Sequence, residues 1–245
     1  MITDYHRPAT LEEALHLLHR PGVSSMVIGG GTDLVTRQIN TRVEVIDLQA
    51  ACPNGVAEAS DRVVIGAMTR LQDLITDEQV PPLLRDLARR EGPNTLRNAG
   101  TIGGAVAAAD PESELVAGLL VHDAVVLFAG LDGETSVRLD EFLADRSSLG
   151  GGIIVSVSVA TGGVTAAART GRTPADTSIV AAVGRSTADG TLLALTGVAV
   201  TPIVINKADV PRLQPPPDFR GSPEYRRSLA GTLIDRVLDD LGGAA

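Results

Sequence analysis

The chain has 245 residues, enough for a buried core and for one large domain or two to three small ones. A net charge of −9, with only two Tyr, three Phe and no Trp, argues against nucleic-acid binding, which needs basic surfaces and stacking side chains. A single cysteine excludes an intrachain disulfide and a cysteine-ligated metal cluster, and because no apolar run is long enough for a membrane span we expect a cytoplasmic protein.

The first predicted elements are a helix and two strands. Thr10 and Glu13 form a capping-box pair that predicts the start of a helix. Residues 25–28 are a short apolar strand that runs directly into the glycine-rich segment 29–33, and residues 43–48 predict the next strand. We therefore expect a β-α-β-like unit at the N-terminus.

The middle of the chain predicts helices between short strands. Pro81 opens a helix that we expect to run to about Glu91. A second glycine-rich segment, residues 97–105, follows in what we expect to be a polar loop. Asp110 predicts an N-cap, because Pro and Glu come directly after it. Strands are expected over residues 62–67, 124–129, 135–139 and 153–159, with a hairpin turn at residues 132–133.

The last third has a different pattern. Three strands over residues 164–170, 179–186 and 191–200 predict an antiparallel meander, with a hairpin turn at residues 189–190. A proline-rich link then leads to a terminal helix that begins at residue 222 or 223. The predicted fold class is α+β.

Two glycine-rich segments, residues 29–33 and 100–104, are the candidates for ligand binding. Glycine allows a ligand to approach the backbone, and successive N–H groups can bind an anion. Thr32 and Thr101 add hydroxyl donors, so the two segments together could hold a diphosphate. Neither segment has the dinucleotide-binding or the P-loop spacing, and the alternative is that both are ordinary tight turns.

Taken together, five segments of this sequence resemble one family. Residues 5–18 match Y-x-R-P-x-[ST]-x-x-E-A-x-x-L-L, and residues 29–34 match A-G-G-[TH]-[DS]-L from its second position. Residues 63–69 match V-x-I-G-A-x-T, and residues 97–105 resemble R-N-x-[GA]-T-[IV]-G-G-N. Residues 220–233 match R-G-S-x-E-Y-R-x-x-L-A-x-x-L. The chain thus resembles the FAD-binding medium subunit of molybdenum hydroxylases, the flavoproteins of carbon monoxide dehydrogenase and xanthine dehydrogenase.

The resemblance implies a two-subdomain FAD-binding fold of the PCMH type. Residues 1–55 and 56–161 would form the two subdomains, with FAD held between them. Residues 162–245 would form a shortened α+β C-terminal domain of the carbon monoxide dehydrogenase flavoprotein type, with a three-stranded antiparallel sheet.

The resemblance also assigns residues to the cofactor. The two glycine segments would hold the FAD diphosphate, Glu114 would reach the ribityl or ring side of the flavin, and Ile154 would cover the isoalloxazine ring. The family needs no metal ligand on this subunit. The residues so assigned are Gly29, Gly30, Gly31, Thr32, Asp33, Leu34, Thr101, Ile102, Gly103, Gly104, Glu114 and Ile154.

The function implied by the resemblance is electron transfer. Substrate would be oxidised at a molybdenum centre on a large subunit, and electrons would pass through iron–sulfur clusters on a small subunit to this FAD. The flavin would then reduce an external small-molecule acceptor. The chain would therefore be the FAD-dependent oxidoreductase subunit of a molybdenum hydroxylase.

Three positions depart from the family pattern. Ala105 replaces an Asn, Ala108 replaces a polar residue, and Ala168 stands where the family often has a Lys beside the flavin. The scarcity of aromatic residues also leaves no obvious side chain to stack on a flavin. Two alternatives stay open: a stand-alone or repurposed paralogue with a weakened or absent FAD site that acts on a different small molecule, and a non-catalytic binding protein.

Overall fold

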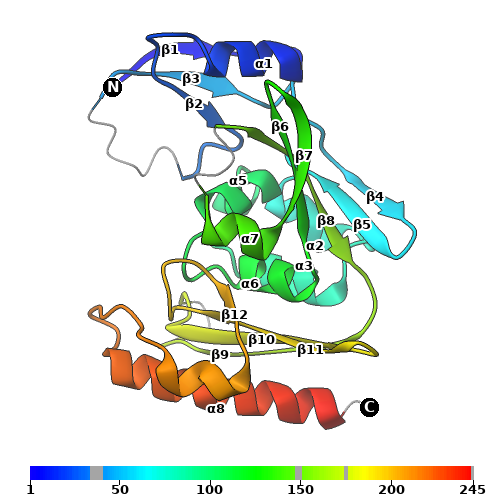
Figure 1. The fold of residues 1–245 in the computed structure, drawn as a ribbon, viewed down its shortest axis with the longest axis vertical. Coiled ribbons are helices and arrows are strands. Elements are labelled where there is room, and N and C mark those ends of the chain that lie inside the picture. Colours follow the sequence, from blue (N-terminus) through cyan, green and yellow to red (C-terminus); the bar gives the residue numbers. More distant parts are fainter. Residues whose placement is uncertain (34–40, 147–150, 174–175, 244–245) are drawn as a thin grey trace.

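The N-terminal segment forms a parallel sheet covered by one helix. The structure, a computed structural model, describes residues 1–33, 41–146, 151–173 and 176–243. The strand order is β1-β3-β2, and α1 lies across this sheet at one end of the molecule (Figure 1). The elements are β1 (Ile2–His6), α1 (Leu11–Leu18), β2 (Ser25–Ile28) and β3 (Val43–Asp47).

The capping box at the start of α1 is confirmed. The N–H of Glu13 donates to Oγ1 of Thr10 (3.2 Å), and Oε2 of Glu13 accepts from the N–H of Ala9 (2.8 Å). The strand β1 was not predicted, because its side chains are mostly exposed and carry no apolar pattern.

The middle segment forms a five-stranded antiparallel sheet in the order β4-β5-β8-β6-β7. The predicted hairpin is present, but its turn lies at residues 131–132, one residue earlier than the predicted 132–133, because Gly130 pairs with Gly133. The strands are β4 (Val56–Ala59), β5 (Arg62–Gly66), β6 (Val125–Gly130), β7 (Gly133–Arg138) and β8 (Ile153–Ala160). The helices are α2 (Leu71–Thr76), α3 (Pro82–Ala88), α4 (Asn94–Arg97), α5 (Ile102–Ala108), α6 (Glu114–Val121) and α7 (Leu139–Ala144).

Two sequence predictions in the middle segment are wrong. The helix expected to start at Asp110 starts at Glu114, because Ser113 is the N-cap and its Oγ accepts from the N–H of Val116 (3.0 Å). The segment 100–104 is not a loop throughout. Thr101 is the N-cap of α5, so Gly103 and Gly104 lie in the first turn of that helix.

The C-terminal segment forms an antiparallel sheet with α8 packed on one face (Figure 1). The sheet has four strands and not the three predicted, because the two residues of β12 pair with Ala194 and Leu195 of β11. So short a strand leaves no pattern in the sequence. The elements are β9 (Val164–Thr170), β10 (Val180–Thr187), β11 (Gly190–Thr196), β12 (Ile203–Val204), a 3₁₀ helix (Lys207–Arg212) and α8 (Pro223–Gly243).

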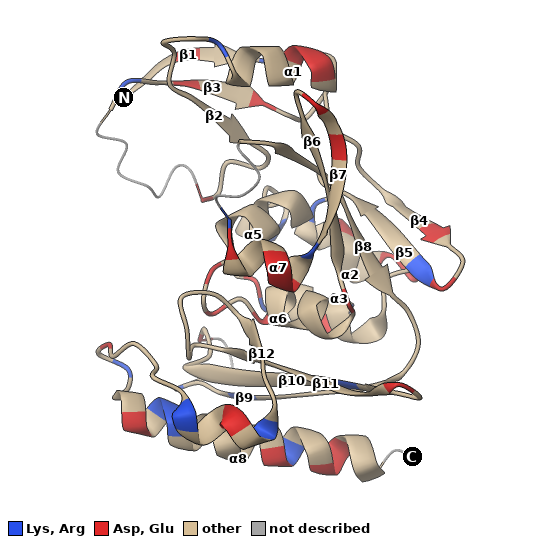
Figure 2. Ribbon diagram, viewed as in Figure 1, with Lys and Arg blue, Asp and Glu red and all other residues tan. Residues whose placement is uncertain are grey.

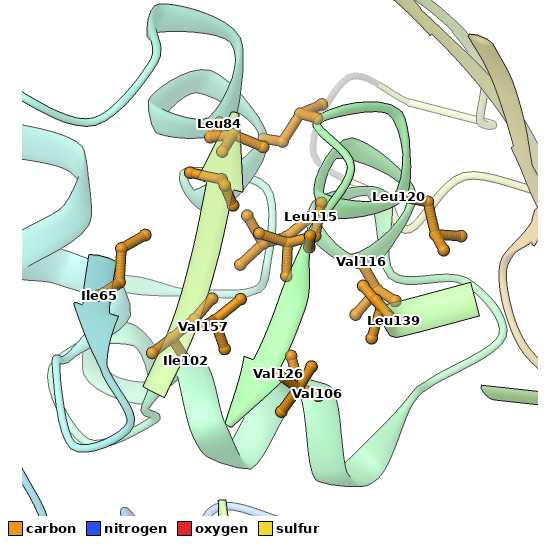
Figure 3. Close-up of a cluster of buried hydrophobic side chains, with 14 of the residues drawn as sticks. Ile65, Leu84, Ile102, Val106, Leu115, Val116, Leu120, Val126, Leu139 and Val157 are labelled. Atoms are coloured by element: carbon orange, nitrogen blue, oxygen red, sulfur yellow. The ribbon is translucent and has the colours of Figure 1, made fainter. Parts of the chain in front are cut away.

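The largest core cluster lies between the middle and C-terminal sheets. Every residue of α6 is buried, and β10 and β11 contact this helix on the face opposite α8. Figure 3 shows Leu115, Val116 and Leu120 of α6 among the side chains of this cluster. A Cβ on Gly118 would lie 2.5 Å from Leu87 Cδ1, so any larger residue there would require the leucine side chains of α3 to move.

Two arginines of the terminal motif hold the C-terminal segment together and join it to the turn before α6. Arg226, 2% exposed, donates to the carbonyls of Ile179 (2.8 Å) and Gly197 (2.7 Å). Arg220 pairs with Glu112 in that turn, and the N–H of Gly197 donates to Pro111 O (2.7 Å). These contacts place the C-terminal segment directly beside the α5–α6 connection.

Each of the three sheets lies within one of the three predicted segments, and we keep the division at residues 55 and 161 as a proposal. Among the described residues, no helix combines the length and the apolar character needed to cross a membrane. Basic and acidic residues alternate along α8, and Lys207 pairs there with Asp235 (2.6 Å) (Figure 2).

Candidate functional site

A cavity of about 650 Å³ lies where the N-terminal sheet meets the middle sheet. The end of β2, the start of α5 and the strand β8 all contribute to its wall, and α7 closes another side. This volume is in the range of a small-molecule or cofactor site. Of the predicted cofactor residues, those that line it are Gly29, Gly30, Gly31, Thr32, Asp33, Thr101, Gly103, Gly104 and Ile154.

The two glycine segments are in direct contact, although they lie far apart in the sequence. A Cβ on Gly30 would lie 1.7 Å from the carbonyl oxygen of Ala99, and a Cβ on Gly29 would lie 2.7 Å from Oγ1 of Thr101. Any other residue at Gly30 would push the segments apart. The glycines are therefore required first by this backbone contact, which shapes one wall of the cavity.

The first segment offers free backbone donors. Among the described residues, the N–H groups of Gly30, Gly31 and Thr32 donate to no other group. Successive unpaired N–H groups on a cavity wall form a site for an anion such as a phosphate. Gly31 also has a φ of +72°, a conformation that glycine adopts without strain.

The second segment uses its N–H groups internally. Ile102 donates to Thr69 O (3.0 Å), Gly103 to Ala67 O (2.9 Å) and Gly104 to Oγ1 of Thr101 (3.1 Å). The expected second set of free N–H groups is therefore not present at these positions. What the segment adds is a flat glycine surface and the Thr101 hydroxyl hydrogen, because Oγ1 acts only as acceptor in the bond from Gly104.

The apolar part of the cavity contains aromatic side chains that the sequence did not point to. Phe128 and Phe142 both line it, with ring centroids 5.0 Å apart, and Ile154 and Met68 lie on the same wall. The sequence offered no obvious aromatic side chain for a flavin, and the structure places two at the cavity. Two of the chain's three Phe residues gather here, and only the pairing of β6 with β8 and the position of α7 bring them together.

Of the predicted cofactor residues that the structure describes, Ile102 and Glu114 do not line the cavity. Leu34 lies outside the described residues. Ile102 is fully buried in the core of the middle segment. Glu114 is also buried, and its carboxylate pairs with Nη1 of Arg90 (2.8 Å) and with Nε of Arg169 (2.8 Å). Because Arg169 belongs to β9, Glu114 links the middle segment to the C-terminal sheet.

The three alanines that depart from the family pattern have different surroundings. Ala108 lines the cavity, so its small side chain leaves space there. Ala105 packs against the core of the middle segment, and Ala168 packs against the apolar cluster between β10 and α8. Of the three, only Ala108 is on the described cavity wall.

A buried carboxyl group lies next to the Glu114 ion pair. Oε1 of Glu91 accepts from the Ser113 hydroxyl (2.9 Å) and from the N–H of Leu115 (3.0 Å). Burial raises the pKa of Glu91 to about 7 from its usual 4.5. An unfolded chain loses this proton near pH 4.5 and the folded protein keeps it until about pH 7, so the folded state loses stability as the pH rises through this interval.

We expect Glu91→Gln to remove this pH dependence, because the neutral amide keeps the acceptor oxygen. Between about pH 5.5 and pH 8.5, the stability of the variant relative to the wild type should rise by about 2 kcal/mol. Urea denaturation across this range measures it, with the exposed Glu12→Gln as control. A constant difference between variant and wild type would contradict the assignment to Glu91.

The geometry fits a ligand that has both a phosphate part and a flat apolar part. The unpaired N–H groups of the first segment suit a phosphate, and Phe128, Phe142 and Ile154 suit a ring system. A flavin dinucleotide has both parts.

Comparison with known proteins also points to a flavin dinucleotide. Residues 1–160 match the family model described as the FAD binding domain in molybdopterin dehydrogenase. The chain is 30% identical to the uncharacterized protein YgfM of Escherichia coli K12, over 98% of this chain and 96% of that protein. It is 27% identical to the carbon monoxide dehydrogenase medium chain of Hydrogenophaga pseudoflava, over 96% of each chain.

A solved structure has the same fold. Carbon monoxide dehydrogenase from Hydrogenophaga pseudoflava superposes with a TM-score of 0.87 at 26% identity, over 99% of this chain and 98% of that chain. The similarity includes the C-terminal sheet and α8, which lie beyond the residues matched by the family model.

Proposed function

Because the chain belongs to the family of FAD-binding domains found in molybdopterin dehydrogenases, we propose that it transfers electrons from iron–sulfur clusters, through its FAD, to an external acceptor. The family membership makes it an FAD-binding oxidoreductase subunit. The direction of electron flow and the acceptor are the parts that we propose.

The observation that carries the proposal is the contact between the two glycine segments at the cavity. It brings unpaired N–H groups of Gly30, Gly31 and Thr32 beside the hydroxyl of Thr101. Backbone donors of this kind do not depend on side chains, so the replacements at Ala105 and Ala108 do not remove them.

We assign the roles of the binding residues as follows. The first glycine segment binds the diphosphate, Thr101 donates its hydroxyl hydrogen, and Asp33 accepts from ligand hydroxyl groups. Ile154 and the two Phe rings exclude water from the ring system. Bound FAD would supply the redox chemistry, since it can accept and release electrons. Glu114 as a flavin ligand stays a prediction, and its present ion pairs favour a role in joining the segments.

The partners follow from the relatives. The similar proteins include medium chains of carbon monoxide dehydrogenases and subunit alpha of a 6-hydroxypseudooxynicotine dehydrogenase complex. We propose that this chain likewise assembles with a small iron–sulfur subunit and a large molybdenum subunit, and that a small-molecule acceptor reoxidises the flavin.

The second candidate is a repurposed paralogue with a weakened FAD site. Ala108 on the cavity wall favours it, because a side chain that could bond to the cofactor is missing there. Each lost hydrogen bond would cost about 0.5–1.5 kcal/mol of binding free energy. Cofactor content distinguishes this candidate from the first.

We expect the purified protein to carry FAD, or to bind added FAD with the quenching of flavin fluorescence that accompanies burial. The visible absorbance spectrum and chromatography of the released cofactor measure its identity and amount. Metal analysis of the complex isolated from its source should find iron and molybdenum in stoichiometric amounts. A protein that binds no FAD at excess cofactor would refute the electron-transfer proposal and favour the repurposed paralogue.

A further inference from the structure

Arg146 places a positive charge on the wall of the cavity. It comes shortly after α7 and lines the same cavity as the first glycine segment. Its guanidinium lies at the C-terminal end of α5, where it donates to the carbonyls of Ala107 and Ala108. Its Cζ lies 6.0 Å from the centroid of the Phe142 ring, at the outer limit of a cation–π contact. Backbone contacts and an aromatic ring thus hold the group in place.

Among the described residues, no carboxylate forms an ion pair with Arg146. Arg90 and Arg220, in contrast, each pair with a glutamate. The carbonyl contacts use only part of the donors of the guanidinium. Among the described residues that line the cavity, Asp33 and Arg146 are the charged ones.

The alanines beside Arg146 give it room. Ala107 and Ala108 both line the cavity, and their side chains end at the Cβ atom. Arg146 is the cation among the described residues of a cavity wall that also presents unpaired N–H groups, and these donors together favour an anionic group of the ligand.

We propose that Arg146 is a specificity-determining residue that binds the phosphate groups of the nucleotide. It would favour a phosphate-containing nucleotide over an uncharged flavin, and it would replace the polar contact that Ala108 lacks. This inference rests on the proposed function, since it concerns the same cavity. The inference goes beyond the proposed function, because here the charge of one side chain, and not the backbone, decides which ligand binds.

The test compares ligands with and without phosphate. FAD, ADP and riboflavin are titrated into wild type, Arg146→Gln, Arg146→Lys and the control Arg212→Gln, an exposed arginine paired with Asp209. Loss of a charge-assisted contact should raise the Kd of Arg146→Gln for FAD and ADP about 10- to 100-fold and leave riboflavin within about twofold. The salt dependence of ADP binding should become shallower, and Arg146→Lys should restore part of the affinity.

The outcomes separate the two proposals. An unchanged Kd for ADP and FAD in Arg146→Gln, or an equal loss for riboflavin, would overturn the role of Arg146. So would a lower melting temperature of the unliganded variant with unchanged ADP binding, which would mean that Arg146 only caps α5. A wild type that binds ADP through Arg146 but binds no FAD would refute the proposed function and support this inference.

Discussion

Replacing Gly30 with alanine should abolish tight FAD binding and destabilise the protein. The added Cβ would lie 1.7 Å from the carbonyl oxygen of Ala99, and backbone on both sides leaves no flexible side chain to move away. The segments must separate, at a cost of about 3 kcal/mol in the free energy of unfolding. Because the N–H groups of the first segment then lose their position, the Kd for FAD should rise at least ~100-fold.

The control for this prediction is Gly231→Ala in α8. A Cβ there would have only Val210 Cγ1 within reach, at 3.9 Å, and alanine is favoured over glycine inside a helix by about 1 kcal/mol. The control should therefore be as stable as the wild type or more stable, with unchanged FAD binding. Urea denaturation and FAD titration measure both quantities. A Gly30→Ala protein with wild-type stability and affinity would show that the two segments are not in contact.

The sequence was most informative where a local pattern determines the structure. The capping box of α1 depends on residues three apart, and the hairpin between β6 and β7 depends on a short turn that the sequence located to within one residue. The glycine segments were recognised by composition and by resemblance. Their actual constraint, the contact of Gly30 with Ala99, is a tertiary one, and no local pattern in the sequence could reveal it.

The parts that the sequence missed depend on long-range packing. Phe128 and Phe142 belong to a strand and a helix that meet only in the folded protein, and Arg146 follows a helix that was not predicted. The start of α6 was misplaced because Asp110, Pro111 and Glu112 form a good N-cap sequence. In the structure Asp110 accepts instead from the N–H of Glu112 (2.8 Å), in a turn that precedes the Ser113 cap.

The later start of α6 also changes the interpretation of Glu114. At the first position of α6, its buried carboxylate points to Arg90 of the middle segment and to Arg169 of β9. We expect Glu114→Gln to lower the free energy of unfolding by about 3 kcal/mol, because the neutral amide no longer attracts the two guanidinium groups that face it in this buried position. This loss of free energy is at the lower end of what breaking a buried ion pair costs, since Arg90 and Arg169 keep some contact with solvent.

The matched control is Glu12→Gln. The Glu12 side chain pairs with His16 but is 86% exposed, so this variant should show no measurable change in stability. FAD titration of both variants decides between two roles for Glu114. If Glu114 joins the middle segment to the C-terminal sheet, stability falls and the Kd for FAD of the folded protein changes little. If Glu114 contacts the flavin, the Kd rises while the stability of the FAD-free protein stays at the wild-type value. Because its carboxylate already forms ion pairs with two arginines, we expect the first result.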